Sequence, residues 1–76
     1  GHLVLVPHKD QPKVVGPVGM ILGEKDVNIA GMQLGRRELG GDSLMVLIVD
    51  NEVSASVLEE LKKVPAVFKA AYLYFG

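Results

Sequence analysis

The sequence predicts one small domain of the α+β class with the element order β-α-β-β-α-β. Two observations support this prediction: two segments place apolar residues at helical spacing, and four short apolar runs flank them. The chain has 76 residues, and a domain of this size buries only about 60% of the surface of its unfolded chain. Because 49% of the residues are hydrophobic and there is no cysteine for a disulfide, we expect part of the apolar surface to contact a partner chain.

The first third of the chain predicts a strand, a polar loop and a helix. The run HLVLV at residues 2–6 is typical of a short strand, which we expect to end at Pro7 because proline has no N–H for a sheet ladder. A loop follows at residues 7–13. Apolar residues at helical spacing then predict a helix over residues 14–25, and Pro17 fits its first turn, where the backbone N–H has no helical acceptor.

The middle of the chain predicts a β-hairpin. The stretch VNIAGMQLGRRE, residues 27–38, alternates so that Ala30, Met32 and Leu34 share one apolar face. The segment LGGDS then supplies a glycine-rich turn, and the continuous aliphatic run LMVLIVD at residues 44–50 predicts the returning strand.

The last part of the chain predicts a helix and a closing strand. Ser54 or Ser56 can cap the helix, and Pro65 ends it. Its expected buried stripe consists of Val57, Leu58, Leu61 and Val64. The run VFKAAYLYF at residues 67–75 predicts the final strand.

This order of elements predicts the ferredoxin-like arrangement. Right-handed crossovers put both helices on one face of a four-stranded antiparallel sheet and leave the other face open. The first and third predicted strands carry apolar residues at consecutive positions, so the open face or an edge has more apolar surface than a monomer tolerates. We therefore expect a homodimer.

Composition argues against several classes of function. Eight basic and nine acidic residues give a formal net charge of −1, which provides no electrostatic footprint for nucleic acid or an anionic membrane. No apolar run approaches the roughly 20 residues of a membrane span, and nothing resembles a cleaved signal. We expect a soluble, cytoplasmic protein with no nucleic-acid or membrane partner. The sequence leaves open whether Gly1 and His2 are native or a cloning remnant.

No catalytic or metal centre is predicted within the chain. The glycines of the first helix are spaced for close packing and do not precede it as a phosphate-binding loop would. His2, His8 and Asp10 form too small a set of ligands for a metal ion, and no serine is placed by spacing beside His8 as a nucleophile. We therefore predict no metal ion, no cofactor and no active site of its own.

Polar side chains gather instead around the start of the first helix. His8 and Asp10 lie in the loop before it, and Asn28 lies just after it. Each has an ordinary structural role open to it: a solvated loop histidine, a helix cap and a turn cap. Together with the N-terminus of the helix, however, they suit a zwitterion whose carboxylate meets the helix N–H groups and whose ammonium meets Asp10.

These residues resemble the ACT domain family, and the resemblance covers essentially the whole chain. It rests on the element order, on HKDQP before the first helix and on VNIAGMQLGRRELGGDSLMVLIVD. The sequence is most similar to the C-terminal regulatory ACT domains of bacterial D-3-phosphoglycerate dehydrogenases. Residues 1–76 are thus expected to be a single regulatory domain, a fragment of a larger enzyme whose catalytic region uses NAD.

The resemblance also implies a ligand and a set of binding residues. Such domains pair side by side so that their sheets join, and L-serine binds at the interface as an allosteric inhibitor. By position in this sequence, the resemblance assigns ligand binding to His8, Asp10, Gln11, Pro12, Lys13, Asn28 and Ile29. Asn28 is implied to act across the interface. The chain departs from the family in having Asp10 where asparagine is common and Lys13 where glycine usually follows Pro12.

Two alternatives stay open at this point. The domain could be a constitutive dimerisation module in which His8 and Asn28 are ordinary polar residues. It could also be the regulatory segment of an iron–sulfur L-serine dehydratase, which looks similar.

Overall fold

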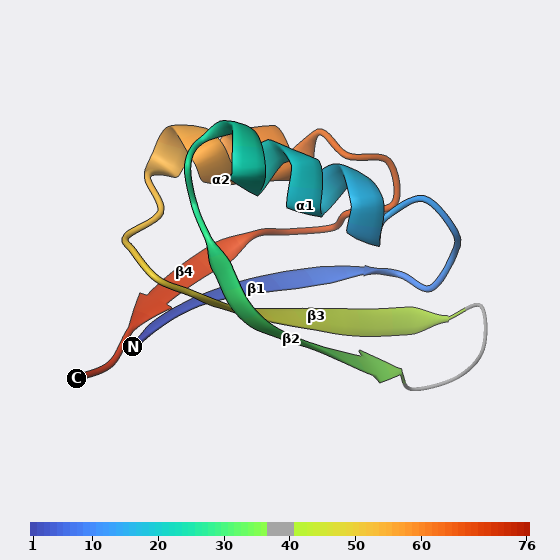
Figure 1. Ribbon diagram of the computed structural model, residues 1–76. Coiled ribbons are helices and arrows are strands. Elements are labelled where there is room, and N and C mark those ends of the chain that lie inside the picture. Colours follow the sequence, from blue (N-terminus) through green and yellow to red (C-terminus); the bar gives the residue numbers. More distant parts are fainter. Residues whose placement is uncertain (37–40) are drawn as a thin grey trace.

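The computed structural model describes residues 1–36 and 41–76 (Figure 1). Its elements in chain order are β1 (His2–Lys9), α1 (Val15–Glu24), β2 (Ile29–Arg36), β3 (Asp42–Val49), α2 (Ala55–Lys62) and β4 (Ala71–Tyr74). This order confirms the predicted β-α-β-β-α-β arrangement. Part of the predicted hairpin turn, residues 37–40, lies outside the described residues.

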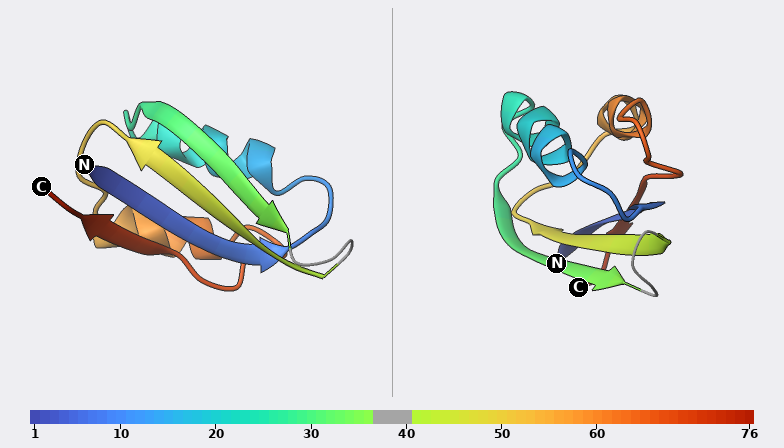
Figure 2. Two further views of the ribbon diagram at one scale, coloured as in Figure 1. Left: turned by 90° about the horizontal axis from the view of Figure 1, so that it is seen from below. Right: turned by 90° about the vertical axis from the view of Figure 1, so that its right-hand side faces the viewer.

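The strands form one antiparallel sheet in the order β2-β3-β1-β4, so β2 and β4 are its edges. Figure 2 shows both helices on the same side of this sheet, with the other face uncovered by any described element. The predicted ferredoxin-like fold is thereby confirmed. In the described part of the chain no helix is long and apolar enough to cross a membrane.

The core lies between the helices and the sheet. Alternation along β1 and β3 turns every second side chain towards the helices, which meet them with their own apolar stripes. The largest fully buried side chains are Leu22, Met45, Leu47, Leu61, Val4, Val6, Val14 and Val18. The stripe predicted for the second helix is confirmed for Val57 and Leu61, which are buried, and Leu58, which is partly buried; Val64 is also buried but lies beyond the end of α2.

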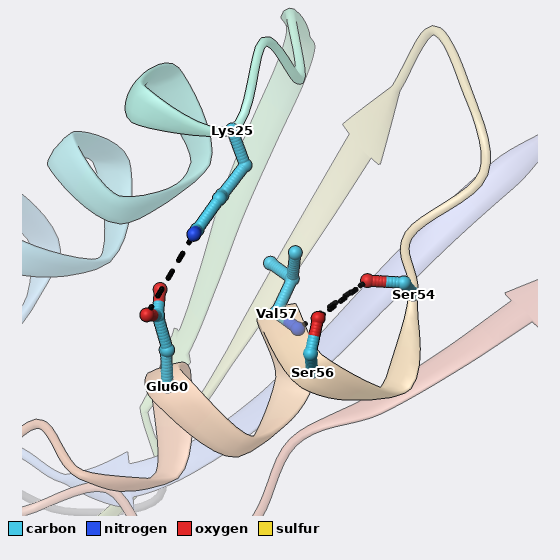
Figure 3. Close-up of polar contacts among 5 residues, drawn as sticks. All are labelled: Lys25, Ser54, Ser56, Val57 and Glu60. Carbon is cyan, nitrogen blue, oxygen red and sulfur yellow. Dashed lines mark hydrogen bonds and ion pairs between the residues drawn. The ribbon is translucent and has the colours of Figure 1, made fainter.

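The second helix is capped by Ser54, one of the two serines predicted for this role. Ser54 is the N-cap residue, and its Oγ accepts a hydrogen bond from the backbone N–H of Val57 at 3.4 Å, while Ser56 lies inside the first turn (Figure 3). Lys25, at the end of α1, reaches across to Glu60 of α2, with 3.7 Å between Nζ and Oε1. Both side chains are nearly half exposed, so this ion pair adds little to stability.

The first strand is longer than predicted, because the nitrogen of Pro7 faces away from β3. The Pro7 carbonyl accepts from the N–H of Phe68 at 2.9 Å, and in a strand the nitrogen of a residue faces the same side as its carbonyl. On that side β4 pairs with β1 only as far as Leu5. Pro7 therefore removes no donor from the ladder with β3, and the expectation that the strand ends there is wrong.

The final strand is shorter than predicted. Regular pairing covers only Ala71–Tyr74, whereas Val67 forms an isolated bridge with His8. The intervening chain is held by single contacts to the end of β1, including the bond from Lys9 N–H to the carbonyl of Ala66 at 2.8 Å. The register shifts by one residue between the Leu5–Ala71 pair and the His8–Val67 bridge, which interrupts the regular pairing of the intervening chain with β1.

The apolar face predicted for the second strand is present only in part, because a bulge between Ile29 and Gly31 puts Ile29, opposite Val49, and not Ala30 on the face of Met32 and Leu34. Met32 and Leu34 pair with Leu47 and Met45 of β3, which puts them on the helix-bearing face of the sheet. They remain 41% and 53% exposed because β2 is an edge strand. The chain therefore presents an apolar margin along β2.

Candidate functional site

A cavity of about 370 Å³ lies at the end of the sheet where β1 runs into the loop before α1. It is lined by His8, Asp10, Gln11, Val15, Leu34 and Ser43. These residues come from β1, the loop, the first turn of α1, β2 and β3, so four elements and the loop meet there. The volume suits a small metabolite, within the usual range of ligand pockets.

His8 is the most deeply buried polar residue of this cavity, with 3% of its surface exposed. Its Nδ1 lies 2.9 Å from the carbonyl oxygen of Lys9. A carbonyl only accepts, so Nδ1 donates to it, and in the tautomer with its proton on Nδ1 the Nε2 atom is an acceptor. Within the described residues Nε2 is buried without a hydrogen-bond partner, which is costly unless a ligand or water supplies a donor.

The loop before α1 is anchored at both ends. The N–H of Asp10 donates to the carbonyl of Gly41 at 2.7 Å, and Val14 is buried at the start of the helix. Ser43, the register partner of His8, donates from Oγ to the carbonyl of Gly35 at 2.8 Å. These contacts fix the position of His8 and Asp10 relative to the β2 edge.

The positive end of α1 faces this region. Its N-cap residue is Val14, which offers no side-chain acceptor, and its first turn holds no acidic residue. Val15, the first helical residue, lines the cavity. The partial positive charge of the helix N-terminus is thus not neutralised from within the helix and favours a ligand carboxylate. The alternative role of Asp10 as the N-cap residue is wrong, since Val14 occupies that position.

Lys13 lies in the same loop but outside the cavity. Its backbone has a φ of 68°, which is the left-handed region that favours glycine, and its side chain is exposed. Pro12 is exposed as well, and neither residue lines the cavity. Glycine at this position is therefore favoured by backbone conformation, and Lys13 does not fill the space beside His8.

Asn28 and Ile29 lie at the other end of the sheet. The carbonyl of Asn28 accepts from the N–H of Asp50, just beyond β3, whereas His8 pairs with Ser43 at the start of β3. Six residues of strand correspond to about 20 Å. One copy of the chain therefore brings His8, Asp10 and Gln11 together and does not bring Asn28 or Ile29 to them.

Three lining residues were missed by the sequence analysis. Ser43 and Leu34 reach the cavity only through strand register, and Val15 does so through the direction of the first helical turn. Neither the strand register nor the direction of the first helical turn can be read from the linear sequence. Among the described residues no cluster of three metal-ligating side chains occurs.

Fold and cavity together define the class of protein, a small ferredoxin-like domain with a ligand-sized pocket beside an edge strand. The ACT domain family model matches residues 2–66. The chain therefore belongs to the ACT domain family, whose members are regulatory domains without a catalytic site of their own.

Individual relatives agree with this assignment. The chain is 46% identical over 67 residues to the D-3-phosphoglycerate dehydrogenase of Bacillus subtilis, covering 88% of this chain and 13% of that enzyme. It is 41% identical over 75 residues to the D-3-phosphoglycerate dehydrogenase of Archaeoglobus fulgidus, covering 96% and 14%. A probable L-serine dehydratase beta chain of Bacillus subtilis is 29% identical, covering 87% and 30%. The chain thus spans a small part of the length of these relatives.

A solved structure supports the fold. The ACT domain from GTP pyrophosphokinase of Chlorobium tepidum superimposes with a TM-score of 0.73 and covers 95% of each chain. Its sequence identity is 17%, so this likeness concerns the fold alone.

Proposed function

We propose that this chain is the regulatory domain of a D-3-phosphoglycerate dehydrogenase and binds L-serine at the interface of a homodimer. The observation that carries the proposal is the buried, unpartnered Nε2 of His8 in a cavity that opens beside an edge strand. The relatives at 46% and 41% identity support this choice of parent enzyme.

The exposed apolar margin of β2 supports side-by-side pairing with a second copy. An edge strand has unpaired N–H and C=O groups, and Met32 and Leu34 leave apolar surface there that a twin would cover. Two β2 strands related by a two-fold axis run antiparallel, so the start of one lies beside the end of the other. Asn28 of the second copy, directly before its β2, would then stand near Leu34 and the cavity of the first.

The charges of the cavity suit an amino acid with a hydroxyl group. The N-terminus of α1 would receive the α-carboxylate, and Asp10 would attract the α-ammonium. The His8 ring with its proton on Nδ1 offers an acceptor at Nε2, which the hydroxyl of serine can satisfy and the methyl group of alanine cannot. This difference would favour serine over alanine.

Occupancy can be transmitted because the site is shared between two copies. A ligand that contacts both copies binds best to one arrangement of the subunits and shifts the population towards it. The NAD-dependent catalytic region that responds would lie outside these 76 residues. We place the whole enzyme in the cytoplasm, as expected for amino-acid biosynthesis.

The relative at 29% identity supports a second parent. A probable L-serine dehydratase beta chain carries a similar segment, and a regulatory ACT domain that binds serine would serve either enzyme. Sequence preceding Gly1 in the natural protein distinguishes them, because only the dehydrogenase has a dinucleotide-binding motif.

Calorimetric titration of the chain with L-serine tests the proposal, with glycine and L-alanine as comparison ligands. We expect saturable heat for serine and much weaker binding of alanine. Asn28→Ala should weaken binding strongly, whereas Asn51→Ala, another exposed asparagine, should leave the affinity unchanged. A dimer that gives no heat with any of the three ligands would indicate a constitutive dimerisation module instead.

A further inference from the structure

A second cavity, of about 480 Å³, lies at the opposite edge and the opposite end of the sheet from the first. It is lined by His2, Glu52, Tyr72 and Tyr74. The two tyrosines come from β4, His2 comes from β1, and Glu52 comes from the segment between β3 and α2. In Figure 1 the start of β1 and the end of β4 are near the two chain termini, whereas the loop before α1 is at the far end. None of its residues takes part in the proposed serine site.

The aromatic rings of this cavity lie against one another, with Tyr72 stacked on His2 and Tyr74 tilted by 51° to it. His2 and Tyr72 are stacked, with ring centroids 5.9 Å apart and planes inclined by 20°. Tyr74, directly opposite His2 in the sheet register, lies 5.0 Å from it, centroid to centroid. The Tyr72 hydroxyl is 2.6 Å from Nδ1 of His2, so these two polar groups satisfy each other. Tyr74 remains 65% exposed and offers a ring face to a ligand.

Glu52 is the one acidic residue among the four that line this cavity. No ion pair to Glu52 occurs within the described part of the chain. Its negative charge acts on the aromatic rings. Burial is the larger cause that raises the pKa of the Tyr72 hydroxyl, and the charge of Glu52 is the next. An unpaired carboxylate beside aromatic faces attracts a cation that can also lie against the rings.

We propose that the cavity formed by His2, Glu52, Tyr72 and Tyr74 binds a guanidinium group. A guanidinium is planar, weakly hydrated and able to stack on aromatic rings while it donates hydrogen bonds to a carboxylate. A compact ammonium ion holds its water more strongly and has no flat face to place on Tyr74. The same guanidinium chemistry can come from free arginine or from an arginine residue of a polypeptide.

Titration of the isotope-labelled chain with L-arginine, followed by amide and side-chain resonances, tests this site. L-Citrulline is the matched control ligand, because its urea group has the shape of a guanidinium without the charge. We expect saturable shifts confined to the four lining residues and their neighbours for arginine, and none for citrulline. Glu52→Gln should lower the affinity for arginine by about 3- to 10-fold. Glu24→Gln, an exposed carboxylate on α1, should leave it unchanged.

A Tyr74→Leu variant tests the aromatic contribution separately, since this exposed side chain can be replaced without disturbing the core. It too should weaken arginine binding severalfold. N-acetyl-L-argininamide identifies the source of the group: tighter binding of this compound than of arginine indicates a residue in a polypeptide, and the reverse indicates the free amino acid. The proposal is overturned by the absence of saturation at arginine concentrations on the order of 100 mM, by equal shifts with citrulline, or by an unchanged affinity in Glu52→Gln.

Discussion

Asn28 donates a hydrogen bond from Nδ2 to Oδ2 of Asp50 over 2.5 Å. A carboxylate only accepts, so this contact fixes the orientation of the Asn28 amide. Among the described residues its Oδ1 has no hydrogen-bond donor and is available as an acceptor. The backbone strengthens the link, because the N–H of Asp50 donates to the carbonyl of Asn28 at 3.1 Å. In the proposed dimer this amide would stand near the cavity of the second copy, and Asp50 would then be a positioning residue for the effector.

We expect Asp50→Ala to weaken serine binding about 2- to 10-fold, because a net hydrogen bond contributes about 0.5–1.5 kcal/mol. Calorimetric titration measures this change, and the free energy of unfolding should fall by no more than about 0.5–1.5 kcal/mol, the net contribution of the lost hydrogen bond. Glu24→Ala is the control for removing an exposed carboxylate elsewhere. An unchanged affinity in Asp50→Ala would show that Asn28 needs no such support.

The dimer should depend on β2 rather than on the open sheet face or on β4. Leu34→Asp places a charge on the apolar margin of β2 and is expected to convert the dimer to a monomer, measured by sedimentation velocity. Ile48→Asp on the open face and Leu73→Asp on β4 change residues of similar exposure, 46% and 50%, and should leave the dimer intact. Dissociation by either control, with Leu34→Asp still dimeric, would place the interface elsewhere.

Lys13 carries backbone strain that glycine would remove. Its φ of 68° is costly for a residue with a Cβ, by about 1–2 kcal/mol, and glycine recovers this at an entropic cost of about 0.5–1 kcal/mol. We expect Lys13→Gly to raise the free energy of unfolding by about 0.5–1 kcal/mol, measured by urea denaturation at fixed chain concentration.

Lys69→Gly is the matched control for this prediction. Lys69 is also exposed but lies outside the left-handed region, so the same change should lower the free energy of unfolding by about 0.4–1 kcal/mol. If both variants lose stability, the loop does not hold Lys13 in a strained conformation in solution.

The sequence predicted the elements well because each helix and strand has its own local pattern. The stripe of Val57 and Leu61 follows from helical spacing alone, and both residues are buried. Pro7 shows the limit of such reasoning, since its effect depends on whether its nitrogen faces β3 or β4. That side is a property of the sheet order, which no local pattern contains.

The candidate site was predictable only where it is local in sequence. His8, Asp10 and Gln11 follow one another along the chain and do share a cavity. Leu34 and Ser43 join them through strand register, which depends on long-range pairing. Asn28 is about 20 Å away in the same copy, so its part in the site depends on a second chain and stays a prediction.

His8 should be needed for ligand binding but should add little to the stability of the domain without ligand. Because Nε2 is buried without a protein partner, His8→Leu removes an unsatisfied acceptor at the cost of the Nδ1 contact to the exposed Lys9. We expect the free energy of unfolding without ligand to change by less than about 1 kcal/mol and serine binding to be lost. Urea denaturation and calorimetry measure the two effects. A loss of stability above about 2 kcal/mol in the absence of serine would instead mark His8 as a structural residue.

Tyr72 should make the domain sensitive to alkali. Partial burial, then the charge of Glu52 and that of ionised Tyr74, raise the pKa of its hydroxyl above the ordinary 10.0. The contribution of Tyr72 to stability is therefore complete below pH 10.0 and is lost as the pH rises through the folded pKa, because the unfolded chain releases the proton first.

In a Tyr74→Phe variant Tyr72 is the only tyrosine, so ultraviolet absorbance of the phenolate reports it alone. We expect its midpoint above pH 10.0, and a lower midpoint, still above 10.0, when Glu52→Gln is added, because burial is the larger cause. In urea denaturation above pH 10.0, Tyr72→Phe should lose stability less steeply with pH than the unchanged chain. A midpoint at or below 10.0 would mean that neither burial nor Glu52 acts on this hydroxyl in solution.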